Sequence, residues 1–382
     1  MVIGIDSSRA FIGDKTGTEN YSYHLITSIL RLPESKLHTF VLFIRPNATL
    51  PLEMDGYTNV KVREIKLPYL WTQLGLAWET WTGDDLDVLW IPAHTLPVLR
   101  KPSIRTVVTI HGLEYQWLPE YKNWLQKWYL PLSTYYAVNS ANRLIAVSKF
   151  TEKQLLKELH TNSKKIKVIH EGVATIKPLN NYTIGMTLKK YDLRDKKYAL
   201  FVGTVQPRKN LTALIEAYGD FVKSLPDQDL DKHDYKLVIA GSIGWMAQDT
   251  LSAPSRLGIQ EKVVFTGRVT DLELRDLYLG AQIYVQPSIT EGFGLPVLEA
   301  MGAGVPVISS NGGALPEVVG NAGLIVELGA MFRTELAKTI KKLVENPRLR
   351  QKLIDAGKNR VREYSWEKVA KETLKLLIDT AY

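Results

Sequence analysis

Short β-branched runs that alternate with helix-length segments are the feature that most constrains the fold of this 382-residue chain. Each run is apolar on both faces, as in a parallel sheet that helices cover on both sides. Twelve such strands are too many for one doubly wound sheet, so we predict two sheets. The runs are MVIGID, HTFVLFIRP, DVLWIPA, IRTVVTIHG, NRLIAVS and KIKVIHEG in the first half, and YALFVG, YKLVIAG, KVVFTG, QIYVQPS, VPVISS and GLIVE in the second.

A polar segment between the two sets of strands, from about Thr175 to Lys197, marks the domain boundary, because it carries Pro and Asn residues between two strand signals. The sequence therefore predicts an α/β protein with two Rossmann-like, doubly wound domains, residues 1–178 and 196–364, that face each other across a cleft. Residues 365–382 are expected to form a final helix, with Ser365 as its N-cap, that packs back on the N-terminal domain.

The composition narrows the choice of partners and of cellular compartment. There are no cysteines, so disulfides and thiolate metal sites are excluded, which fits a reducing compartment. The net charge of +8 is scattered, so no nucleic-acid partner is expected, although a basic surface suits anionic lipid or a phosphorylated substrate. MVIGIDSSRA does not resemble a signal peptide, and no apolar run approaches the ~20 residues of a membrane span. We expect a cytoplasmic protein, at most attached peripherally at the inner face of the membrane.

Two carboxylates, Glu291 and Glu299, lie in the apolar, glycine-rich stretch EGFGLPVLEAMGAG, where an unpaired buried carboxylate would be costly. LPVLEAM predicts a short helix with Pro296 in its first turn. The N–H groups at the helix start predict an anion site. Those groups belong to Phe293, Gly294 and Leu295.

A carboxylate accepts hydrogen bonds from a pair of hydroxyls such as a ribose diol. Glu291 lies before the predicted anion site, and Glu299 lies one turn into the helix. A ligand with a sugar, a phosphate and a ribose in sequence would therefore contact Glu291, the helix start and Glu299. Such a ligand is a nucleotide sugar. For either glutamate alone, a solvated loop or helix residue is the simpler interpretation, whereas the pair in this context favours the ligand.

The stretch resembles the E-x7-E signature of retaining glycosyltransferases of the GT-B fold, in particular family 4 (group 1). NGGALPEVVGNAGLIVE, VGTVQPRKNL, VVFTGRVTD, LVIAGSIGW and TIHGLEY are also similar to family motifs, most specifically between Phe201 and Glu327. The resemblance implies a transferase of polysaccharide biosynthesis that moves a sugar from a nucleotide-sugar donor to a carbohydrate or lipid-linked acceptor. It implies retention of the anomeric configuration, an N-terminal acceptor domain and a C-terminal donor domain.

Adjacent cations in VGTVQPRKNL, Arg208 and Lys209, follow a predicted strand and suit a diphosphate that gains negative charge as its bond to the sugar breaks. In similar enzymes an Arg and a Lys of this loop bind the donor diphosphate, whereas a surface basic pair is the plain alternative. The resemblance also implies that His111 in TIHGLEY reaches the donor sugar, although a lone histidine is more often structural. The remaining donor-binding positions that it implies are Gly17, Arg268 and Val269.

The first loop, SSRAFIGDKTGTENYSYHL, departs from the family pattern. Similar enzymes often carry G-x-G before the first helix, whereas here Gly17 is followed by Glu19 at the second position. A carboxylate against a phosphate is unfavourable, so either Glu19 points to acceptor hydroxyls or only the backbone N–H contacts the donor.

No metal or other cofactor is expected. Two aspartate-rich segments, Asp84 to Asp87 and Asp227 to Asp234, look like the D-x-D metal motif of the other major glycosyltransferase fold. Both precede predicted strands instead of following them, so we interpret them as solvated turns. We interpret Ser148 as a helix N-cap and His170 as a structural residue near the domain joint.

Seven of the nine tryptophans lie in the first half of the chain. Core packing is the default explanation, and an acceptor platform or a membrane-surface patch is the alternative. They are Trp71, Trp78, Trp81, Trp90, Trp117, Trp124 and Trp128.

Three function classes follow from these observations. The first is the retaining hexosyltransferase, with GDP-mannose as the expected donor because TIHGLEY and LPYLWTQLGL look like the mannosyltransferase-like branch. The second is a non-catalytic nucleotide-sugar-binding protein, which donor hydrolysis without acceptor would distinguish. The third is a Rossmann-type oxidoreductase, which needs a G-x-G-x-x-G motif after an early strand that IGIDSS and VGTVQPR do not supply.

Overall fold

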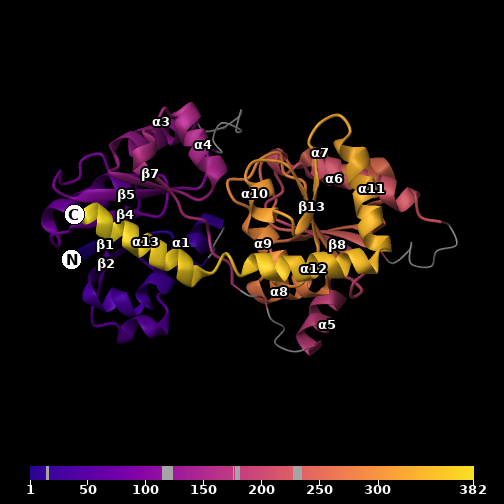
Figure 1. The fold of residues 1–382 in the computed structure, drawn as a ribbon, viewed down its shortest axis with the longest axis horizontal. Coiled ribbons are helices and arrows are strands. Elements are labelled where there is room, and N and C mark those ends of the chain that lie inside the picture. The colour runs from indigo at the N-terminus through magenta and orange to yellow at the C-terminus, as the bar shows by residue number, and fades with distance from the viewer. Residues whose placement is uncertain (14–16, 114–123, 175, 177–180, 227–234) are drawn as a thin grey trace. The chain divides into compact units, whose positions relative to one another are not determined.

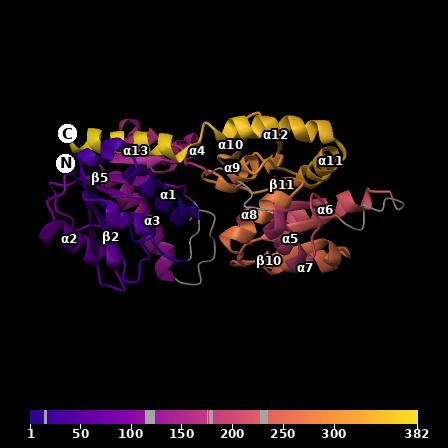
Figure 2. The same cartoon turned by 90° about the horizontal axis from the view of Figure 1, so that it is seen from below.

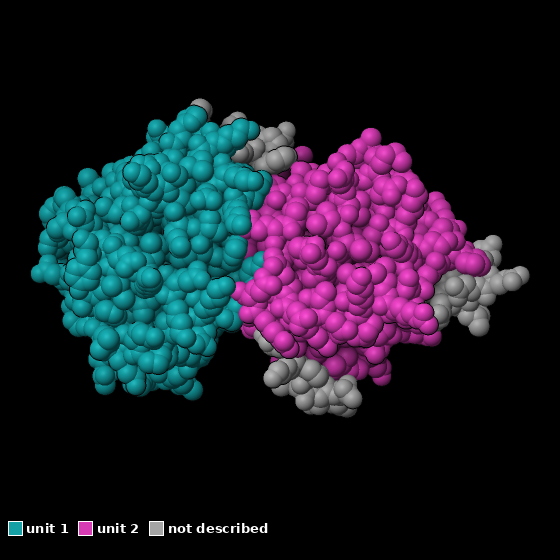
Figure 3. Space-filling view, in the orientation of Figure 1, with its two compact units in different colours: residues 1–172, 364–382 teal, residues 173–363 magenta. Residues whose placement is uncertain are grey.

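The computed structural model describes residues 1–13, 17–113, 124–174, 176, 181–226 and 235–382, which divide into two compact units. Unit 1 contains Met1–Gly172 and Tyr364–Tyr382, and unit 2 contains Val173–Glu363 (Figure 3). Each unit holds one parallel sheet with helices on both faces (Figure 1). The predicted α/β class with two Rossmann-like sheets is therefore confirmed.

The sheet of unit 1 has seven parallel strands in the order β3-β2-β1-β4-β5-β6-β7. All six strands predicted in the first half are present, and the additional strand is β3, at one edge. Its alternating polar residues are mostly exposed, so it lacks the apolar run that identifies the others. The strands are β1 (Val2–Asp6), β2 (Thr39–Ile44), β3 (Val60–Glu64), β4 (Val88–Ile91), β5 (Arg105–Ile110), β6 (Arg143–Ala146) and β7 (Ile166–Val168).

The C-terminal helix α13 (Trp366–Ala381) belongs to unit 1, where it lies beside α1 (Figures 1 and 2). Ser365 caps it, as predicted, by accepting from the N–H of Lys368 at 3.3 Å. A Cβ added to Gly172 would lie 2.5 Å from the Trp366 ring, so the return of the chain requires glycine there.

The other helices of unit 1 complete its two outer layers. The segment before α2 and the C-terminal half of α3 pack on the sheet face opposite α1 and α13. The helices are α1 (Gly17–Leu30), η1 (Pro33–Leu37), η2 (Leu52–Gly56), η3 (Trp71–Leu76), α2 (Ala77–Thr82), α3 (Trp124–Ser140), α4 (Lys149–Glu158) and η5 (Ser163–Lys165).

Unit 2 has six parallel strands in the order β10-β9-β8-β11-β12-β13, and all six were predicted. Its strands are β8 (Tyr198–Val202), β9 (Lys236–Ala240), β10 (Val263–Gly267), β11 (Ile283–Gln286), β12 (Val307–Ser310) and β13 (Gly323–Val326). Its helices are α5 (Asn181–Lys190), η6 (Pro207–Lys209), α6 (Leu211–Lys223), α7 (Gln248–Leu257), η8 (Gln260–Lys262), α8 (Asp271–Gly280), α9 (Leu295–Gly302), α10 (Leu315–Val319), α11 (Phe332–Glu345) and α12 (Pro347–Val361). Within the described ranges, no helix is long and apolar enough to cross a bilayer.

Candidate functional site

The strand order of unit 2 reverses at β8, because the chain continues to β9 and β10 on one side and to β11, β12 and β13 on the other. Loops that leave the carboxyl ends of β8 and β11 therefore diverge and open a crevice, which is where doubly wound sheets bind ligands. Arg208 and Lys209 lie in the short helix after β8, and Glu291 lies in the loop after β11. The three sequence-predicted residues meet at this point.

Glu291 forms a buried ion pair with both cations. Its Oε2 accepts from Nη1 of Arg208 at 2.9 Å, and its Oε1 accepts from Nζ of Lys209 at 2.6 Å. The Glu291 and Lys209 residues are 6% and 8% exposed. The Glu291 carboxylate, for which the sequence indicated no protein partner, thus neutralises one of the two adjacent positive charges. The three groups together carry a net charge of +1.

Two neutral side chains complete the shell of Glu291, and the sequence analysis missed both. Ser288 Oγ and Gln286 Nε2 donate to Oε1 at 2.6 and 2.8 Å. They lie at the carboxyl end of β11, in QPSITE, and this position just before the glutamate was the available signal. A Cβ on Gly312 would lie 2.4 Å from the carbonyl oxygens of Ser288 and Ile289, so the loop after β12 packs directly on this segment.

The surroundings of Glu291 strongly favour its ionised form. Burial alone would raise its pKa, but the charges of Lys209 and Arg208, with the hydrogen bonds from Lys209 and Ser288, hold the pKa of Glu291 at about 2. The carboxylate is therefore charged at neutral pH and keeps the two cations in place.

The predicted helix after Glu291 is present as α9, and its N-cap Gly294 has a φ of 109°, which strongly favours glycine. Phe293 is buried, Leu295 is the first helical residue, and Pro296 lies in the first turn, as predicted. The start of α9 therefore turns sharply out of the loop that carries Glu291. Backbone N–H groups at such a helix start suit an anion.

Glu299 lies in the second turn of α9 and is half-buried. Its Oε2 accepts from the hydroxyl of Tyr278 on α8 at 2.8 Å. Burial and the neighbouring Glu299 carboxylate raise the pKa of Tyr278 well above its ordinary value, so this phenol stays protonated and donates. The tyrosine is a third residue that the sequence analysis missed, because it lies 21 residues before Glu299 on another helix.

Arg268 and Val269 lie between β10 and α8, also at the carboxyl edge of this sheet. Arg268 is exposed and Val269 is half-buried. The loop ends at Thr270, which caps α8 in a capping box with Glu273. Apart from Glu299 in the second turn of α9, the sequence-predicted residues of unit 2 thus lie on loops, a short helix or a helix start along one sheet edge.

His111 follows β5 in unit 1, and both of its ring nitrogens already have protein partners. Nδ1 lies 3.0 Å from Oε1 of Glu171, and Nε2 lies 2.9 Å from the carbonyl oxygen of Pro92. The ring also packs edge-on against Tyr21, with 4.6 Å between centroids. A hydrogen bond from His111 to a sugar would therefore require the exchange of one of these partners.

The first loop of unit 1 places a charged pair near this edge. Glu19 is 8% exposed and accepts from Nη1 of Arg9 at 3.2 Å. Gly17 begins α1, and a Cβ added there would meet nothing within 4 Å, so packing does not require glycine at this position. His94, which the sequence analysis missed, faces His111 at 5.7 Å after β4; burial and the neighbouring charges lower its pKa to about 3.

The described residues settle several of the structural interpretations. Ser148 caps α4 by accepting from the N–H of Thr151 at 3.0 Å, as predicted. His170 packs against Tyr364 within unit 1. Within the described ranges, no cluster of His, Asp or Glu has the geometry of a metal site. Asp84 pairs with Lys61 and Arg63, whereas Asp227 to Asp234 lie outside the described residues.

The tryptophans of the first half divide into two groups. Trp71 and Trp90 are buried, so core packing is correct for them. Trp78 and Trp81 are 67% and 56% exposed, so core packing is wrong for that pair, because α2 turns them away from the sheet. Trp117 and the side chains of Trp124 and Trp128 lie outside the description.

Comparisons with known proteins cover both units. Residues 188–360 match the family described as Glycosyl transferases group 1, and residues 17–177 match Glycosyltransferase Family 4. The chain is 32% identical to the O-antigen chain mannosyltransferase B of Escherichia coli over 199 residues, which are 52% of this chain and 50% of that protein. The chain spans about half the length of the curated relatives it matches.

Two solved structures share the fold over almost the whole chain. A glycosyltransferase from Rickettsia africae is 20% identical, with a TM-score of 0.71, over 99% of this chain and 98% of that one. Anabaena HepE, solved in complex with UDP-glucose, is 16% identical, with a TM-score of 0.70, over 99% of both chains. The predicted GT-B fold is thereby confirmed.

Proposed function

Because this chain belongs to the group 1 glycosyltransferases, with a family 4 N-terminal half, we propose that it transfers a hexose from a nucleotide sugar to a glycan or lipid-linked acceptor. The observation that carries the proposal is the ion-paired trio of Arg208, Lys209 and Glu291 at the strand-order reversal of unit 2. In the proposed site these two cations bind the leaving diphosphate.

The proposed donor site uses three features of one sheet edge. The net positive charge of the trio and the start of α9, at Phe293, Gly294 and Leu295, favour the diphosphate. Glu299 would accept from the ribose hydroxyls, and Glu291 would orient the sugar while it holds the two cations. Arg268 and Val269, at the same sheet edge, complete the contacts proposed for unit 2, and donor contacts from Gly17 and His111 of unit 1 stay predictions from the family resemblance.

GDP-mannose and retention of the anomeric configuration are the finer parts of this proposal. The Escherichia coli relative is a mannosyltransferase, which supports mannose as the sugar. We propose front-face attack, in which the leaving diphosphate accepts the acceptor's proton, because Glu291, the described carboxylate assigned to the sugar, is already held by Arg208 and Lys209. The absence of cysteine fits a cytoplasmic reaction.

One experiment tests the donor. The melting temperature and the release of nucleoside diphosphate are measured over a panel of GDP- and UDP-sugars, with and without a lipid-linked glycan acceptor. GDP-mannose is expected to raise the melting temperature most, because a ligand that binds only the native state stabilises it. If a UDP-sugar raises the melting temperature more than GDP-mannose does, that UDP-sugar becomes the proposed donor. If no nucleotide sugar changes the melting temperature or releases diphosphate, the proposed function is rejected. A rise in melting temperature without any release of diphosphate, with or without acceptor, would indicate a binding protein.

We expect Glu299→Ala to weaken nucleoside diphosphate binding by about tenfold or more, because a hydrogen bond to a charged group contributes roughly 1.5–3 kcal/mol. Isothermal titration with GDP measures it. Tyr278→Phe is the matched control, since it removes the partner of Glu299 at 2.8 Å but keeps the carboxylate. Equal losses in both variants would mean that Glu299 acts only through Tyr278, and unchanged affinity in Glu299→Ala would remove the ribose contact.

We also expect the reaction to be independent of metal ions, because in the proposed site Arg208 and Lys209 neutralise the diphosphate. Turnover measured in EDTA should equal that in Mg²⁺ or Mn²⁺. Activity that disappears in EDTA and returns with Mn²⁺ would contradict this part of the proposal.

A further inference from the structure

Several large apolar side chains of unit 1 are exposed to solvent. We call Trp78, Trp81, Val98, Leu99 and Tyr135 the apolar patch; each is more than half exposed. Contiguous exposed apolar surface of this kind marks an interaction site. Tryptophan and tyrosine are also the residues that favour the interface between a bilayer and water.

Hydrogen bonds hold the three segments of the apolar patch together. The indole N–H of Trp81 on α2 donates to the carbonyl of Leu99 at 2.9 Å. The hydroxyl of Tyr136, the neighbour of Tyr135 on α3, donates to the carbonyl of Val98 at 3.2 Å. The patch is therefore built from α2, the loop before β5 and α3, and it is not a set of scattered side chains.

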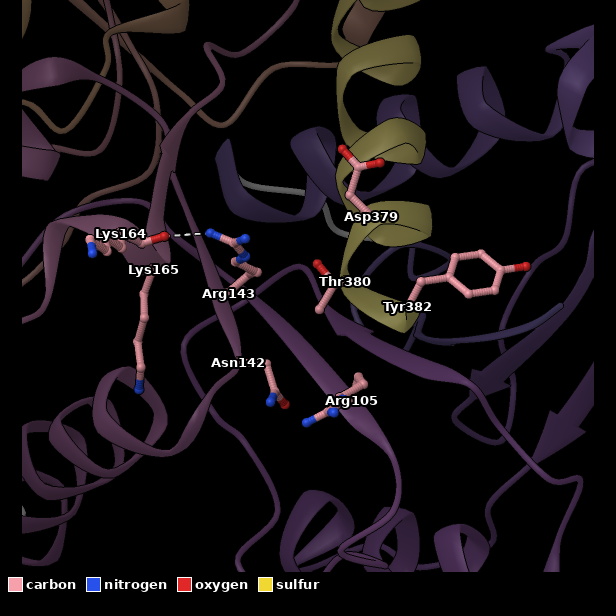
Figure 4. A pocket seen from close by; sticks show the side chains of 8 residues that line it. All are labelled: Arg105, Asn142, Arg143, Lys164, Lys165, Asp379, Thr380 and Tyr382. Atoms are coloured by element: carbon pink, nitrogen blue, oxygen red, sulfur yellow. Dashed lines mark hydrogen bonds between the residues drawn. The ribbon is translucent and has the colours of Figure 1, made fainter.

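A basic pocket lies at the amino ends of β5 and β6 in the same unit (Figure 4). It has a volume of about 340 Å³, and four cations and one carboxylate, Asp379, line it. Figure 4 shows Arg105 and Arg143 at the starts of the two strands, with the end of α13 beside them. The cations are Arg105, Arg143, Lys164 and Lys165, and this group is called the basic pocket below.

The C-terminal end of α3 joins the apolar patch to the basic pocket. Lys165 of the pocket donates to the carbonyl of Asn139 at 2.8 Å. Arg100, which follows Leu99 of the patch, donates to the carbonyl of Ser140 at 3.0 Å. Both features thus lie at the amino edge of the unit 1 sheet, at the opposite end of the strands from His111.

We propose that this amino edge binds the surface of a bilayer that contains anionic phospholipid. The apolar patch enters the boundary between headgroups and acyl chains, and the basic pocket takes the phosphate of a lipid headgroup. The amino edge lies at the opposite end of the unit 1 strands from His111, so a surface-bound chain keeps the carboxyl edge of this sheet turned from the bilayer.

Charge complementarity selects this occupant over an uncharged one. The pocket has four cations for one carboxylate, and two acidic residues of the same edge already have partners. Asp84 pairs with Lys61 at 2.5 Å, and Asp85 pairs with Lys101 at 2.7 Å. A positive surface beside exposed tryptophans fits anionic lipid, because each cation near such a membrane contributes to binding and apolar side chains add to it.

Vesicle co-sedimentation of the full chain tests the proposal without any use of glycosyl transfer, so its result is independent of the proposed function. The probes are vesicles of phosphatidylcholine alone and with 30% phosphatidylglycerol. We expect binding to the anionic vesicles that falls as salt rises, because salt screens exposed charges. Arg105→Gln with Lys164→Gln should weaken this binding by roughly thirtyfold, and Trp78→Ser with Leu99→Ser by at least about tenfold.

Two matched double variants in unit 2 serve as controls. Lys342→Gln with Lys352→Gln removes the same charge, and Leu272→Ser with Met331→Ser removes exposed apolar side chains. Both should bind vesicles like the unmodified chain, and circular dichroism checks that every variant is folded.

Three results would overturn the proposal. The first is equal binding to both vesicle compositions, or control variants that lose as much vesicle binding as the unit 1 variants do. The second is a melting temperature that rises with inorganic phosphate while no vesicle binds, which would assign the pocket to free phosphate. The third is a change of sedimentation coefficient in the Trp78→Ser, Leu99→Ser variant without vesicle binding, which would assign the apolar patch to a second copy of the chain.

Discussion

Replacement of Arg208 and Lys209 together by alanine is expected to leave the enzyme close to inactive. Each single replacement should lower turnover by about 10²–10³. Negative charge grows on the diphosphate as the sugar leaves, so cations beside it bind the transition state more tightly than the ground state. The single variants should therefore lose more in kcat than in affinity for the donor.

Steady-state kinetics of the single and double variants measure this effect, with Lys223→Ala, an exposed cation at the end of α6, as the matched control. Each single variant leaves Glu291 paired with the other cation, Ser288 and Gln286, so the loop should keep its structure. Folded single variants with near-normal turnover would place the diphosphate elsewhere.

Most of the fold could be predicted because a buried parallel strand is recognised from its own short run of apolar residues, without knowledge of its neighbours in the sheet. All twelve predicted runs are strands of the two sheets, since each contains a short apolar stretch between helix-length segments. The strand β3 could not be found this way, because Lys61, Arg63 and Glu64 interrupt any apolar run at an exposed edge. The sequence also left open whether Trp78 and Trp81 pack in the core or lie on the surface, because composition alone does not show which face of a short helix a side chain takes.

The positions of the candidate site residues could be predicted, but not their partners. Arg208, Lys209 and Glu291 were singled out separately, one pair for a diphosphate and the glutamate for a sugar. Their mutual ion pairs join residues 82 and 83 positions apart, and only the neighbouring positions of β8 and β11 bring them together. The same holds for Glu299 and Tyr278, which lie on different helices.

Replacement of Glu291 by glutamine is expected to lower the free energy of unfolding by about 3–5 kcal/mol, because it leaves two cations, Arg208 and the buried Lys209, without their counter-charge. This cost comes in addition to any loss of turnover. Urea unfolding at pH 7 measures it. The matched control is Glu335→Gln, which removes an exposed carboxylate beside Lys338 and should cost less than about 1 kcal/mol.

The pH dependence of the unfolding free energy shows whether Glu291 stabilises the protein through its charge or through its shape. The folded-state pKa of about 2 is below the ordinary value of 4.5, so the stabilisation from Glu291 is complete above about pH 4.5 and is lost as the pH falls towards 2. The difference in unfolding free energy between the unmodified chain and Glu291→Gln should therefore shrink over that interval, while other carboxylates affect both proteins alike. A difference that stays constant from pH 7 to pH 2.5 would mean that the glutamine fails for steric reasons, and the trio would not be held by charge.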